Sequence, residues 1–157
     1  LILDQLNTLT KKPIADLDDI KTILNVDLDP SIELNAIILT NQDGYNFLDQ
    51  LKDADNRPLL QPDPTQPNRK LINGKQVVKV SNRWLPSTGT IEKKAPVYIG
   101  NLKEFIVLFD RQQYSIASTN VGGKAFGRNT TDVRAIQRED VKIFDDEAVV
   151  AGEIALD

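Results

Sequence analysis

The sequence contains no cysteine, no histidine and no methionine. Without cysteine and histidine the chain has no thiolate nucleophile, no Ser-His-Asp or Cys-His arrangement, and no ligands for zinc-finger, iron–sulfur or His-ligated haem sites. These absences exclude whole classes of nucleophilic and metal-dependent proteins. Because no initiator Met is present, we expect the chain to be part of a longer product.

Long apolar runs and an excess of positive charge are also missing. No stretch approaches the roughly 20 apolar residues of a membrane span, and the N-terminus has no basic region followed by an apolar core. The net charge of −4 argues against attraction of the whole surface to nucleic acid or to an anionic membrane. We therefore expect no membrane partner and no specific nucleic-acid partner. The 157 residues are enough for about one domain with its own core.

Strong local signals lie in the first half of the chain. Asp16 is a suitable N-cap for a helix whose apolar stripe follows at 17–24. Residues 35–40 are typical of a buried strand, and Asn41 directly after them is the expected N-cap of a second helix. Asn73-Gly74 predicts a hairpin turn between strands at 70–72 and 76–80. Pro13 is expected to break the chain before these elements.

The rest of the chain alternates loops and strands. Residues 61–68 hold three prolines and predict an exposed, stiff loop, and residues 81–95 form another loop around the single Trp84. Buried strands are predicted at 96–100 and 105–109, and an alternating strand at 114–117. Two long strands, at 133–141 and 148–154, are expected to be joined by a corner at 145–147.

Motifs that would carry chemistry are weak. Gly122-Gly123-Lys124 lacks the spacing of a phosphate-binding loop, and Asn129-Thr130-Thr131 fits a cap or turn as well as a glycosylation acceptor. No acidic segment has the spacing of a calcium loop. We therefore predict no catalytic, cofactor-binding or metal residues and no cofactor. The alternative enzyme hypothesis is a carboxylate-based hydrolase, whose two facing acids would come from Asp110, Glu139, Asp140, Asp145, Asp146 and Glu147.

The charge is distributed unevenly along the chain. Residues 69–94 hold seven basic residues against Glu92, a net +6, and residues 139–157 hold seven acidic residues against Lys142, a net −6. The two segments are expected to pair within one chain or to form solvated faces, or to bring copies together head to tail. A third interpretation, and the second alternative function, is a nucleic-acid-binding module that uses 69–94. It lacks the interleaved aromatic residues of a single-strand platform.

Several motifs, taken in order, resemble the major capsid protein family of tailed bacteriophages and prophages. The motifs in the first half are Leu17-Asp18-Asp19-Ile20, Asn35-Ala36-Ile37-Ile38-Leu39-Thr40-Asn41 and Leu51-Lys52-Asp53-Ala54-Asp55-Asn56-Arg57-Pro58-Leu59-Leu60. Those further on are Leu71-Ile72-Asn73-Gly74-Lys75-Gln76-Val77-Val78, Ile99-Gly100-Asn101-Leu102-Lys103, Phe109-Asp110-Arg111, Arg134–Asp140 and Glu147-Ala148-Val149-Val150. The resemblance runs from about Leu17 to Ile154 and is to the C-terminal half of the subunit.

The resemblance implies an α+β, HK-ninety-seven-type fold: a mixed β-sheet flanked by helices (the axial domain) plus long C-terminal strands of the peripheral domain. Residues 13–116 would be axial, and 1–12 with 117–157 would be a remnant of the peripheral domain. The implied function is structural: a virion head subunit that assembles in the bacterial host cytoplasm into hexamers, pentamers and an icosahedral shell. Other capsid, scaffold or portal proteins are further implied partners, and the fragment alone is expected to be monomeric.

The family's Lys–Asn cross-link is not expected here. The loop that would carry the Lys is absent, and Ile136 occupies the place of the promoting Glu, although Asn129 lies on the appropriate segment. Self-association would instead depend on many weak contacts. The residues expected to make subunit contacts are Arg57, Arg69, Lys75, Arg83, Trp84, Lys93 and Lys94.

Overall fold

A seven-stranded mixed sheet forms the centre of the larger of two units. The computed structural model describes residues 2–53, 55–121 and 125–156. The sheet has the order β1-β9-β6-β2-β5-β4-β3, with β1 parallel to β9, β2 parallel to β5 and the other neighbours antiparallel. The strands are β1 (Lys11–Ile14), β2 (Ile37–Asn41), β3 (Gln61–Pro62), β4 (Lys70–Ile72), β5 (Lys75–Val80), β6 (Lys93–Gly100) and β9 (Val149–Leu156). The mixed sheet predicted by the resemblance is therefore present.

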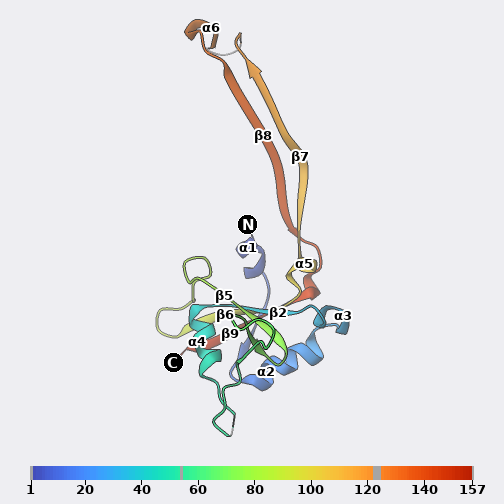
Figure 1. Ribbon diagram of the computed structural model, residues 1–157, viewed down its shortest axis with the longest axis vertical. Coiled ribbons are helices and arrows are strands. Elements are labelled where there is room, and N and C mark those ends of the chain that lie inside the picture. The colour runs from blue at the N-terminus through green and yellow to red at the C-terminus, as the bar shows by residue number, and fades with distance from the viewer. Residues whose placement is uncertain (1, 54, 122–124, 157) are drawn as a thin grey trace. The chain divides into compact units, whose positions relative to one another are not determined.

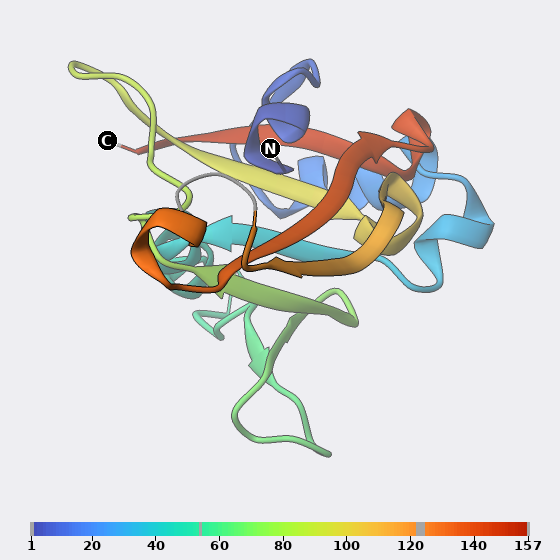
Figure 2. The ribbon, with the colours of Figure 1, turned by 90° about the horizontal axis from the view of Figure 1, so that it is seen from above.

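Helices cover both faces of this sheet. Figures 1 and 2 show α1 (Ile2–Asn7) on one face, and α2 (Leu17–Thr22) and α4 (Gln42–Gln50) on the other. A π-helical turn, η1 (Ile23–Asp27), continues α2, and the short α3 (Pro30–Glu33) precedes β2. Asp16 caps α2 as predicted, and its side chain forms a capping box with Asp19.

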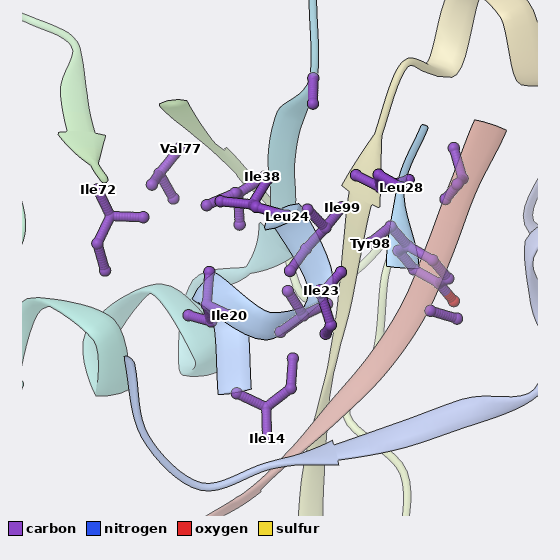
Figure 3. Close-up of a cluster of buried hydrophobic side chains, with 14 of the residues drawn as sticks. Ile14, Ile20, Ile23, Leu24, Leu28, Ile38, Ile72, Val77, Tyr98 and Ile99 are labelled. Atoms are coloured by element: carbon purple, nitrogen blue, oxygen red, sulfur yellow. The ribbon is translucent and has the colours of Figure 1, made fainter. Parts of the chain in front are cut away.

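The main core forms where α2 and η1 meet the sheet. Ile38 of β2 is aligned with Val77 of β5 and with Ile99 of β6, so these side chains lie on the same face. Figure 3 shows Ile20 and Leu24 beside this row of the sheet. Ile20, Ile38 and Ile99 are completely buried, and burial of each such side chain stabilises the fold by about 1.5–3 kcal/mol.

Helix α4 lies very close to the sheet at Gly44. A Cβ at this position would collide with the Thr40 hydroxyl and come within 3.2 Å of the Ala95 side chain. Glycine therefore allows the close approach, and Leu48 on the same helix is fully buried. The approach brings the first turn of α4 against the ends of β2 and β6.

The two edges of the sheet share an unusual composition. Edge strand β1 contains Lys11, Lys12 and Pro13, and edge strand β3 is only two residues long and ends in Pro62. Proline has no N–H to donate to an added strand, and lysine discourages such pairing. Both edges therefore resist extension by another chain.

The second unit is a two-stranded ribbon formed by residues 107–142. It contains β7 (Ile106–Thr119), β8 (Asp132–Ile143) and the short α6 (Ala125–Arg128). No further strand pairs with the ribbon among the residues that the structure describes. Its exposed large apolar side chains are Leu108, Phe109, Tyr114, Ile116, Val121, Phe126 and Val133.

Several predictions from sequence need correction. The strands at 133–141 and 148–154 do not form a hairpin, because β8 pairs with β7 whereas β9 lies between β1 and β6. The run 105–109 is not one buried strand: Phe105 ends α5 (Leu102–Phe105) and is buried, whereas Leu108 and Phe109 are at least half exposed. Pro13 does not break the chain but lies within β1.

The units also divide the chain differently from the expected boundaries. The larger unit comprises 1–106 and 143–157, so the C-terminal segment belongs with the sheet and not with 117–142. The reason is the eight-residue pairing between β6 and β9. The Gly122-Gly123-Lys124 segment lies outside the described residues.

Candidate subunit-contact surfaces

The six acids of the hydrolase hypothesis fall into two groups. Asp110, Glu139 and Asp140 line a recess of about 770 Å³ on the ribbon together with Arg111 and Arg138. These three carboxylates are exposed, whereas catalysis by a carboxyl pair relies on burial to keep one of the pair protonated. The other three acids, Asp145, Asp146 and Glu147, belong to the larger unit.

Two general properties follow from the described residues. They contain no group of three or more acidic side chains arranged to hold a metal ion. None of the helices described here has the length and apolar character needed to cross a membrane.

Some of the predicted contact residues are engaged within the chain. The Lys75 ammonium contacts the Glu33 carboxylate and donates a hydrogen bond to the backbone carbonyl oxygen of Glu33 at 2.6 Å. Only 15% of the Lys75 side chain is exposed. Lys94 lies 3.0 Å from the Glu153 carboxylate across the β6–β9 pair. Both lysines therefore form ion pairs within the chain. The others predicted, Arg57, Arg69, Arg83, Trp84 and Lys93, are exposed.

Trp84 belongs to a segment, residues 81–92, that we call the Trp84 loop. Trp84 is 65% exposed, and the Arg83 guanidinium lies 5.5 Å from the centre of its ring. Further along, a pair of backbone hydrogen bonds between Thr88 and Lys94 closes a small lobe that carries Ile91, which is 98% exposed. Leu85, which lies between Trp84 and Ile91 in the sequence, is buried and anchors the loop.

A polar network ties the Trp84 loop to the start of α4. Asn41 is fully buried; its Oδ1 accepts from the Gly44 N–H at 2.8 Å, which caps the helix. Its Nδ2 donates to the Leu85 carbonyl at 3.1 Å and to the Ser87 hydroxyl at 2.8 Å. One side chain therefore satisfies both the helix end and the loop.

Asp43, in the first turn of α4, extends this network. Its carboxylate accepts from the Ser87 hydroxyl at 2.7 Å and from the Asn82 amide at 3.0 Å. The Ser87 hydroxyl and the Asn82 amide hold the pKa of Asp43 below its usual value, with a smaller contribution from the charge of Lys93. Asn82 also exchanges two hydrogen bonds with Gln42, so the loop is held at several points.

The acidic group of the larger unit lines a second surface. Asp145, Asp146 and Glu147 share a recess of about 600 Å³ with Asp27 and Asp29. Only Asp27 has an ion-pair partner among the described residues, Lys12 at 2.8 Å. Three apolar residues lie within two positions along the sequence of residues that line this recess, and each is about three-quarters exposed: Val26, Leu34 and Phe144. We call the recess and these three residues the acidic surface.

The Trp84 loop and the acidic surface lie at opposite ends of the sheet. The loop leads into Lys93, the first residue of β6, whereas η2 (Asp146–Ala148) leads into Val149, which is aligned with Gly100 at the other end of β6. Eight residues of extended strand separate these ends, about 23 Å. The predicted pairing of the two charged segments within one chain is accordingly limited to Lys94–Glu153 among the described ion pairs.

Comparison with known proteins identifies the class of fold. The structure is similar to two capsid chains described as "Capsid of empty GTA particle computed with C5 symmetry" and "Capsid of native GTA particle computed with C5 symmetry". The TM-scores are 0.54 and 0.56 at 18% and 17% identity, and the matches cover 88% of this chain and 44% of each of those chains. The α+β fold class predicted from sequence is confirmed, and it is that of a capsid protein.

The sequence itself assigns the family. It matches the phage capsid family over residues 2–154, and the chain belongs to that family. This confirms the resemblance found in the sequence, and neither the hydrolase nor the nucleic-acid alternative gains support. No curated protein matches the sequence. The chain spans less than half the length of the capsid chains that it resembles in structure.

The sequence analysis named Trp84, Arg83 and Lys93 as expected subunit contacts, which stays a prediction, and it did not bring the residues of the acidic surface together. The pattern predicts only a corner between strands at 145–147, and Asp27 and Asp29 carry no signal of their own. Their joining depends on α3, η1 and η2 meeting at one end of the sheet. The local signal in the sequence is Phe144 directly before three acids, an apolar residue where a solvated turn has little need of one.

Proposed function

We propose that this chain is a self-associating part of a phage head subunit, which forms hexamers and pentamers and then a shell. It would act in the virion, after assembly in the host cytoplasm, and through contacts rather than catalysis. The larger unit would correspond to the axial domain and the 107–142 ribbon to the peripheral domain. Other capsid, scaffold or portal proteins are candidate partners.

The ribbon is the observation that carries this proposal. A two-stranded ribbon is at best marginally stable in water, because it has no second layer to bury its apolar side chains. Here Tyr114 and Ile116, two alternate residues of β7 that lie on one face, are each more than 70% exposed. Contact with neighbouring copies would bury these side chains. Because the chain belongs to the phage capsid family, a neighbouring copy is the partner that we expect to pack against these exposed side chains.

Electrostatic contacts would add modestly to this association. Exposed ion pairs contribute about 0.2–1 kcal/mol each and are screened by salt. The exposed cations Arg57, Arg69, Arg83 and Lys93 remain candidates for such contacts. Association that depends on several of them should weaken as the ionic strength rises.

The test uses the whole gene product, examined by sedimentation velocity and negative-stain electron microscopy at low and high salt. We expect rings or shells that become fewer at high salt. Tyr114→Asp and Ile116→Asp should abolish association without lowering the thermal stability of the dissociated chain, because both side chains are already exposed. Gln50→Asp, which adds the same charge on the exposed end of α4, is the matched control. A gene product that stays monomeric at every concentration would refute the proposal.

A further inference from the structure

The exposed apolar residues of the larger unit are not scattered. Among its described residues, the large apolar side chains that are exposed are Ile2, Val26, Leu34, Trp84, Ile91 and Phe144. Two of them lie on the Trp84 loop and three on the acidic surface. Each set has a size and mixed character that are common in protein contacts, where aromatic and arginine residues act as anchors.

The charges around the two sets are opposite. Beside the Trp84 loop, the exposed cations are Lys79, Arg83 and Lys93, while Asp43 is occupied by Ser87 and Asn82 and the remaining acid is Glu92. The acidic surface offers the carboxylates of Asp145, Asp146 and Glu147, while Asp27 is paired with Lys12 and Asp29 accepts hydrogen bonds from Ser31. An arginine whose guanidinium lies over a tryptophan ring suits a partner surface that combines carboxylates with apolar side chains.

The geometry requires a second molecule to bring them together. The two surfaces lie at opposite ends of β6, about 23 Å apart, so they cannot meet within one chain. A two-fold contact of the acidic surface with itself would place like charges together, which is unfavourable. A contact between different surfaces of two copies is heterologous, and repetition of it generates a ring or an open chain.

We infer that the Trp84 loop of one copy docks on the acidic surface of a second copy, head to tail, with Trp84 and Arg83 as the anchors. This inference rests on the proposed function, since it names the partner surface of the same self-association. The Asn41 and Asp43 network keeps the loop in place before docking, so less conformational entropy is lost when the contact forms. Trp84 loses its solvent exposure in the contact, and Arg83 meets the carboxylates of Asp146 and Glu147.

The 157 residues contain no cysteine, so engineered cysteines can test the contact directly once any cysteine elsewhere in the gene product has been replaced by serine. Glu92→Cys on the Trp84 loop and Ser31→Cys on the acidic surface, both exposed and neither an anchor, are placed in the whole gene product, singly and together, and treated with a short bis-maleimide under associating conditions. We expect a ladder of covalent oligomers from the double variant. A mixture of the two single variants should stop at dimers, because each copy then has one reactive end. Each single variant alone should stay monomeric on a denaturing gel.

The controls separate the possible failures. Asp55→Cys combined with Ser31→Cys reports random collision, since Asp55 is exposed on a different loop. A single variant that dimerises by itself would overturn the head-to-tail arrangement in favour of a two-fold contact. A double variant that associates by sedimentation but cross-links no more than this control would overturn the inference and leave the proposed function standing. A gene product that does not associate at all would remove both.

Trp84, the one tryptophan of these 157 residues, provides a second measurement that needs no cross-linker, once any other tryptophan of the gene product has been replaced by phenylalanine. Emission from Trp84 should shift to shorter wavelength and become less accessible to iodide as protein concentration rises through association. Trp84→Ala should weaken association by about tenfold or more, as expected for an aromatic anchor. An emission spectrum that is unchanged while sedimentation shows oligomers would exclude Trp84 from the contact.

Discussion

Asn41 offers the most quantitative test of how the Trp84 loop is held. In Asn41→Ala, α4 loses its N-cap, a change that typically costs about 1 kcal/mol. The buried Leu85 carbonyl loses its donor as well, at a cost of about 1–3 kcal/mol for an unsatisfied group. Together these losses predict that the free energy of unfolding falls by about 2–4 kcal/mol.

Urea denaturation measures this change, followed in parallel by far-ultraviolet circular dichroism and by Trp84 emission. With a slope of about 2 kcal/mol/M, the middle of the usual range for a small protein in urea, the midpoint should fall by roughly 1–2 M. Coincident transitions from the two probes would justify a two-state treatment. Gln50→Ala, on the exposed end of the same helix, should change stability by no more than about 0.5 kcal/mol. If Asn41→Ala were as mild as this control, the network would contribute nothing to holding the loop.

Other predictions follow from individual features. The pKa of Asp43 is lowered in the folded chain. Its contribution to stability is therefore present above its unfolded pKa of about 3.9 and is lost as the pH falls through the lower folded value. Urea midpoints measured between pH 7 and pH 2.5 should fall less steeply with acid in Asp43→Asn than in the unchanged chain. Gly100→Ala should lower the free energy of unfolding by about 2 kcal/mol or more, because its φ is positive and a Cβ would collide with the Ala148 carbonyl. Gly74→Ala, whose φ is also positive but which has open space around it, should cost only about 1 kcal/mol in the same urea assay. Equal losses in the two variants would contradict the clash at Gly100. Amide hydrogen exchange in the dissociated chain should be faster in 107–142 than in β6, and association should slow it; protection equal to that of β6 without association would refute the account of the ribbon.

The parts of the fold that sequence predicted correctly are those determined by neighbours along the chain. Asn41 follows a buried strand and precedes an apolar helical stripe, and the cap depends on a residue only three positions away. Asn73 and Gly74 likewise adopt the positive φ angles that their turn requires. Each of these features needs no knowledge of distant segments.

Pairings between distant segments were missed for the same physical reason. Lys11 aligns with Ala151 in the β1–β9 pair, and nothing local to Pro13 signals a strand with so remote a partner. The apolar run at 105–109 predicted burial, and its composition is that of a buried strand. Among the described residues nothing covers Leu108 and Phe109, which are at least half exposed, so the apolar pattern predicted a contact that these residues do not supply. The acidic surface was missed because it joins three separate short helices.

The prolines at both edges of the sheet bear on how a lattice of such chains would be built and repaired. Pro13 and Pro62 prevent the main chain of a neighbour from adding a continuous ladder of hydrogen bonds at β1 or β3. Ladders of that kind grow without limit and separate with difficulty. Contacts made through side chains and loops can instead break one at a time, so a subunit that joins at the wrong angle can leave and join again. The sheet edges would thus make errors during growth reversible.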